Sequence, residues 1–173
     1  MTKQEMNKRL LLPFLALLIA LAAMLLAAFL PQLTATGDFA ESIQAMPDAI
    51  ADAKLDWTAQ DLYHLSMLEY AQLFSEGSVF YLVLFGVLLA FCVLALLFAL
   101  LKKPVPVMIF DVLALGASLI FSSDCTMRGI PQSGRYVWGF GHYLFPIASA
   151  LALGCAVWML VKKVRLKKSL PGT

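Results

Sequence analysis

Four apolar runs, each long enough to cross a lipid bilayer, limit what this chain can fold into. A hydrocarbon core about 30 Å thick needs roughly 20 apolar residues in a helix that rises 1.5 Å per residue. The composition agrees, because 61% of the residues are hydrophobic and only 14% are charged. Backbone groups in hydrocarbon must be satisfied internally, so each run is predicted to be a helix. We therefore expect an all-α membrane protein, a bundle of four transmembrane helices.

The predicted segments divide the chain as follows: an N-terminal segment 1–9, a first span 10–30, a loop 31–77, a second span 78–101, a turn 102–104, a third span 105–123, a loop 124–135, a fourth span 136–161 and a tail 162–173. The first run starts with basic residues, as a signal peptide does, but its 21 apolar residues exceed the usual length of such a core. We expect a retained helix. Pro13 and Pro106 are placed in first turns, where a missing N–H costs little. Pro146 predicts a kink in the fourth span.

The basic residues predict the orientation of the bundle. Of the 13 lysines and arginines, ten fall in the N-terminal segment, the turn and the tail. The loop 31–77 has one lysine against eight acids. Because basic loops stay in the cytoplasm, both termini are predicted to be cytoplasmic and the loop 31–77 to lie outside. The pattern suits a bacterial cytoplasmic (inner) membrane.

The loop 31–77 is predicted to contain two amphipathic segments. The first has apolar residues at helical spacing and is interrupted by Pro47. The second runs from about 59 to 76, with capping-box spacing between Thr58 and Asp61. It carries an apolar stripe of four residues: Tyr63, Met67, Tyr70 and Phe74. Two interpretations are open: the stripe packs on the protein's own helix ends, or it docks a partner.

Asp111 is the one acid inside a predicted span. A carboxylate in hydrocarbon is expensive and usually faces the bundle or water. One interpretation is an ion or proton site, or a polar contact with a partner helix. The other is an interfacial acid that reaches water or pairs with Lys102 or Lys103.

Polar residues also gather at the outer ends of the third and fourth spans. His142 is expected to bond a backbone carbonyl or a neighbouring helix. Asp124, Arg128 and Arg135 form either a polar vestibule or a loop salt bridge of small value. Gly139 and Gly141 predict a close helix approach or a transition from loop to helix. Small residues four apart predict a close-packing face, internal or intermolecular: Ala148, Ala152 and Ala156.

No catalytic or cofactor motif is present. The sequence lacks the P-loop, the dinucleotide fingerprint, the nucleophile elbow and the zinc-protease motif. Cys92, Cys125 and Cys155 include no C-x-x-C pair. Cys92, Asp111 and Cys155 share a similar depth, but two cysteines and one acid without histidine are a poor metal site. We expect no catalytic residue, no metal and no cofactor.

The plan of four spans with a large loop after the first resembles that of claudin-type proteins and of the four-span halves of paraquat-inducible protein A. The claudin W…GLW…C…C signature is missing, since Trp57 is the only tryptophan in the first loop and that loop has no cysteine. The paired cysteine motifs of paraquat-inducible protein A are missing too. The resemblance covers topology alone and implies no site residues.

Size and absent motifs favour a non-catalytic subunit or accessory factor of a larger membrane complex. Its expected contacts are the lipid bilayer and a membrane-protein partner or a second copy, with no nucleic acid. The alternative is a transport component for an ion or a lipid-like molecule that uses Asp111. No internal repeat is visible, so that role would need oligomerisation. A membrane enzyme using Cys125 or His142 lacks a paired partner residue.

Overall fold

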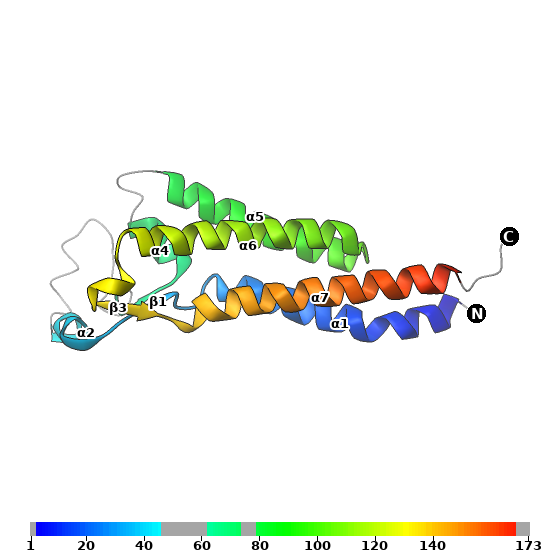
Figure 1. Ribbon diagram of the computed structural model, residues 1–173, viewed down its shortest axis with the longest axis horizontal. Helices are drawn as coiled ribbons and strands as arrows, with labels where there is room; N and C mark the ends of the chain where they lie inside the picture. Colours follow the sequence, from blue (N-terminus) through cyan, green and yellow to red (C-terminus); the bar gives the residue numbers. More distant parts are fainter. Residues whose placement is uncertain (1–2, 46–61, 74–78, 169–173) are drawn as a thin grey trace.

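The computed structural model describes residues 3–45, 62–73 and 79–168 of the chain. Its four long helices lie side by side (Figure 1) and run over these residues: α1 Lys3–Ala27, α5 Phe80–Leu100, α6 Pro104–Met127 and α7 Phe140–Lys168. Each of the four is long and apolar enough to cross a membrane. Together they indicate an integral membrane protein.

The helices overlap the predicted spans but differ from them at several ends. Pro13 lies inside α1 rather than in its first turn, because the helix already begins at Lys3. Helix α6 continues past the predicted third span to Met127. It ends where Gly129 takes a left-handed conformation, with φ of 67°, which a glycine adopts without strain.

A three-stranded antiparallel sheet lies at one end of the bundle, so the expectation of an all-α chain is corrected here. The central strand is β1, Leu33–Ala35. It pairs with β2, His64–Leu65, on one side and with β3, Tyr136–Trp138, on the other. Residues 136–138 were expected to open the fourth span, but they form β3, and α7 begins only after them. Strands of two or three residues are too short to show an alternating pattern.

The two helices expected in the loop 31–77 differ in outcome. Helix α2, Gly37–Ala45, lies in the first predicted segment, whose remainder falls outside the described residues. The second predicted helix is wrong as a continuous element, because β2 interrupts it; within the described residues, α4 covers Met67–Leu73. A capping box formed by Ser66 and Glu69, which was not among the predicted features, starts α4. The Ser66 N–H donates to Glu69 Oε2 at 2.5 Å, and the Glu69 N–H donates to Ser66 Oγ at 3.3 Å.

Helix α7 packs on α1 over the most extensive interface, and α5 packs on α6. The small residues Ala148, Ala152 and Ala156 are buried, so the predicted close-packing face is used inside the chain. Large apolar side chains cover the outside of the bundle. We call the end that carries the sheet the sheet end, and the end with Lys3 and Lys168 the tail end (Figure 1).

Candidate functional site

A hydrogen-bonded network centred on Asp124, here called the Asp124 cluster, joins three helices at the sheet end. The Tyr70 hydroxyl on α4 donates to Asp124 Oδ2 at 2.6 Å, and the Tyr81 hydroxyl on α5 donates to Asp124 Oδ1 at 3.1 Å. Arg128, one turn along α6, donates from Nε to Asp124 Oδ2 at 2.8 Å and from Nη2 to the Tyr81 oxygen at 2.5 Å. Both carboxylate oxygens of Asp124 therefore have donors.

Tyr70 connects the Asp124 cluster to helix α4. Burial, and then the hydrogen bond to Asp124, raise the pKa of Tyr70 above its usual range. The phenol therefore stays protonated and keeps donating to the carboxylate. Its ring also packs against Phe121 of α6, with ring centroids 4.7 Å apart. This hydrogen bond and the aromatic packing of Tyr70 help to hold helix α4 on the end of the bundle.

The apolar stripe expected on the loop is mostly internal. Met67 and Tyr70 are each only 1% exposed. Tyr63 precedes β2 rather than lying on α4, and its ring meets that of His64 with centroids 4.6 Å apart. Phe74 lies outside the described residues. The stripe's two central residues are therefore buried against the protein's own helices.

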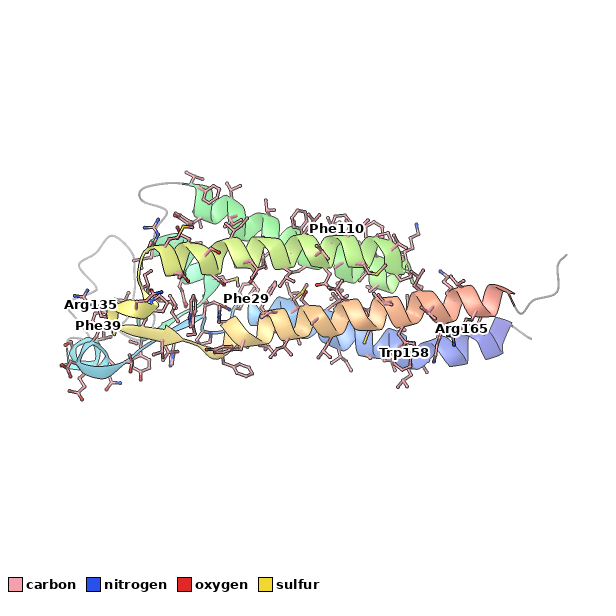
Figure 2. All side chains as sticks on the ribbon, in the orientation of Figure 1. Phe29, Phe39, Phe110, Arg135, Trp158 and Arg165 are labelled. Carbon is pink, nitrogen blue, oxygen red and sulfur yellow. The ribbon has the colours of Figure 1, made fainter. Side chains whose placement is uncertain are left out.

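Arg135, expected to belong with Asp124 and Arg128, lies apart from them. Its guanidinium sits over the Phe39 ring, 5.7 Å from the ring centroid, at the far edge of the sheet end (Figure 2). Within the described part of the chain, no carboxylate forms an ion pair with it. The Arg135 side chain is exposed.

A pocket of about 270 Å³ opens between α2, α4, β3 and the segment after α6. Apolar and aromatic side chains make most of its wall, with both arginines among the lining residues: Phe39, Leu73, Ile130, Tyr136, Arg128 and Arg135. Burial raises the pKa of Tyr136 to about 12, so its hydroxyl is neutral. That hydroxyl donates to the Leu62 carbonyl at 2.9 Å, which ties β3 to the segment just before β2.

Backbone contacts without intervening side chains join the sheet to α1 and α7. The Gly139 N–H donates to the Gln32 carbonyl at 2.7 Å, and the Gly141 N–H donates to the Pro31 carbonyl at 2.8 Å. The buried Gln32 amide donates to the Ala27 carbonyl at 2.7 Å, at the end of α1. A Cβ on Gly141 would lie 2.7 Å from the Leu30 carbonyl oxygen. The predicted close approach is therefore present, whereas no sequence motif pointed to Gln32.

His142 contacts a neighbouring helix through a side chain. Its Nδ1 lies 3.4 Å from Ser122 Oγ on α6. Its ring stacks on Trp138 of β3, with centroids 3.9 Å apart. His142 and its two contacts therefore lie at the sheet end, far along α6 from Asp111.

Asp111 lies inside the bundle with no hydrogen-bond partner. It is 0% exposed, and neither carboxyl oxygen is bonded within the described residues. Ser149 on α7 is near enough to interact with this carboxyl, but the two side chains do not meet hydrogen-bond geometry, and the Ser149 hydroxyl is also fully buried. Cys92 on α5 is buried and lies close enough to Asp111 to experience the charge of its carboxylate.

The interpretation of Asp111 as an interfacial acid is not supported by this environment. The carboxyl does not reach solvent, and neither Lys102 nor Lys103 forms an ion pair with it. The Lys102 ammonium instead lies over the Phe14 ring, 5.6 Å from the centroid.

Among residues 3–45, 62–73 and 79–168, no three histidine, cysteine or acidic side chains lie together as a metal site would need. Comparison with protein-family models, curated proteins and solved structures finds no match to this chain. Its function must therefore be inferred from the chain's own residues.

Proposed function

We propose that this protein is a non-catalytic subunit or accessory factor of a larger membrane complex, and that the pocket at the sheet end receives the partner. The observation that carries the proposal is the exposed Arg135 at an apolar pocket, without a carboxylate partner in the described residues. An apolar wall with one available cation fits a segment that combines apolar side chains with a carboxylate. We assign that segment to a partner membrane protein.

The construction of the pocket supports this role. The Asp124 cluster holds α4 against α5 and α6, and the Tyr136 hydroxyl ties β3 to the segment just before β2. A pocket held by such contacts loses little freedom when a partner binds, which favours affinity. Arg135 rests on Phe39, which orients the guanidinium before the partner arrives.

The proposal includes an orientation and a location. We place both termini in the cytoplasm and the sheet end outside, in a bacterial cytoplasmic membrane, because ten of the 13 basic residues lie in the segments at and near the tail end. Reporter fusions test the orientation: a reporter active only in the cytoplasm should be active at the C-terminus. Activity of a periplasmic reporter at that position would reverse the orientation.

The docking experiment uses a photo-crosslinking residue at Ser133, an exposed lining residue of the pocket. After irradiation of native membranes, we expect a crosslink to one membrane protein, identified by mass. Arg135→Glu should abolish it, and reversing the charge of the partner's crosslinked acid should restore it. The matched control places the same crosslinker at Arg165, near the tail end (Figure 2). A crosslink unaffected by Arg135→Glu would overturn the proposal.

The burial of Asp111 favours a second candidate, a transport component for an ion or a lipid-like molecule. An acid that faces the bundle interior is a common feature of transport pathways. Flux through liposomes that contain the purified protein should then depend on Asp111. Flux unchanged by Asp111→Asn would remove this candidate.

A further inference from the structure

Three helices enclose a small polar cluster in the bundle, made of Asp111, Ser149 and Cys92. Asp111 and Ser149 are 0% exposed, and both Asp111 oxygens and the Ser149 hydroxyl lack hydrogen-bond partners. Buried polar atoms are almost always bonded, so an unbonded set needs an explanation. Asp111 lies seven residues into α6, roughly 10 Å from its start at 1.5 Å per residue.

An ionised carboxylate is the least favourable state for this site. A buried charge is stable only when it is paired or well supplied with donors. The elements packed on α6 supply no cation and a single hydroxyl donor: α5 presents Cys92, α7 presents Ser149, and the turn Pro131–Ser133 has no titratable residue.

The ligand that fits the available atoms is a proton. A hard metal cation takes about six or more oxygen ligands, whereas this site offers two carboxyl oxygens and one hydroxyl. A proton on Asp111 needs a single acceptor, and Ser149 is the hydroxyl that interacts with this carboxyl. The same proton removes the charge that burial disfavours.

We propose that Asp111 and Ser149 form a proton-binding site inside the bundle, in which the protonated carboxyl donates to the Ser149 hydroxyl. The site uses the residue of the second candidate function, but it does not require transport. A bound proton lets the carboxyl sit among apolar residues. Release of that proton would place a charge between α5, α6 and α7.

Infrared spectroscopy of the full-length protein in liposomes tests this site, because a protonated carboxyl has a carbonyl stretch that carboxylates lack. At neutral pH, the wild-type spectrum minus that of Asp111→Asn should contain this band at the intensity of a single carboxyl per chain. The matched control is Asp38→Asn, which removes an exposed acid from α2. Its difference spectrum should contain carboxylate bands instead.

The Ser149→Ala variant tests the assigned acceptor. It should shift the frequency of the protonated-carboxyl band, because the O–H group loses its partner. A carboxylate band lost in Asp111→Asn would overturn the proposal, and so would a carboxyl that ionises when sodium is added. If Asp111→Asn does not accumulate in the membrane, the wild-type protein and Ser149→Ala are compared with isotopically labelled aspartate instead. Absence of a labelled protonated-carboxyl band would then overturn the proposed site. A band without flux would retain the proton site and remove transport.

Discussion

Helix α6 carries two aspartates in opposite surroundings. Asp124, at the sheet end, accepts hydrogen bonds from two tyrosines and an arginine. Asp111, inside the bundle, has no bonded partner and no exposure. The residue type and the helix are the same, so the difference comes from what the neighbouring elements bring to each position.

The sheet end can supply donors because segments outside the long helices cross over it. Tyr70 comes from α4, which begins at the capping box and which the Asp124 cluster holds against α5 and α6. Inside the bundle, the neighbours are helix faces, and close packing there selects small residues such as Ala114 and Ala148. One aspartate is therefore stabilised as an anion, while the other is suited to the neutral state.

The largest effect on stability is expected at the junction between the sheet end and the long helices. Gly141→Ala should lower the free energy of unfolding by about 3 kcal/mol, because the new Cβ meets backbone atoms that cannot move aside. The matched control is Gly154→Ala on the same helix, where a Cβ meets nothing within 4 Å. Denaturant titration in mixed micelles measures both. Equal losses would show that the junction is not closely packed.

The next effect tests the Asp124 cluster. Asp124→Asn should cost about 2 kcal/mol, because hydrogen bonds to a charged group are lost or weakened. The ion pair itself adds little, since Arg128 is 39% exposed and screened by solvent. The same titration measures the change. A loss below that of Asp38→Asn, which changes an exposed acid, would contradict the cluster's role.

Removal of the α4 cap should have a smaller effect. Ser66→Ala deletes one half of the capping box and should cost about 1 kcal/mol. The Ser42 hydroxyl, which donates to the Asp38 carbonyl on the exposed face of α2, provides the control Ser42→Ala. Hydrogen exchange at the α4 amides should increase in the first variant and stay unchanged in the second.

The smallest effect is expected at Asp111. Asp111→Asn should change the free energy of unfolding by about 0.5 kcal/mol or less, because the neutral carboxyl has no strong bond to lose. The free energy of unfolding of Asp124→Asn, measured under identical conditions, is the reference for this small change. A loss as large as that of Asp124→Asn would show that the Asp111 carboxylate is ionised and bound.

The sequence by itself determined the four helices, because helical bonds are local and a long apolar run leaves the backbone no other choice in hydrocarbon. It also marked Asp111 and the two glycines of Gly139–Gly141 as unusual. Only the tertiary structure decided the sheet, since β1 meets β3 across about 100 residues and its strands are too short for a pattern. It likewise decided the partners of Asp124, because Tyr70 and Tyr81 are 54 and 43 residues away in the chain. Contacts between distant segments depend on how whole elements pack, and no local pattern of residues encodes them.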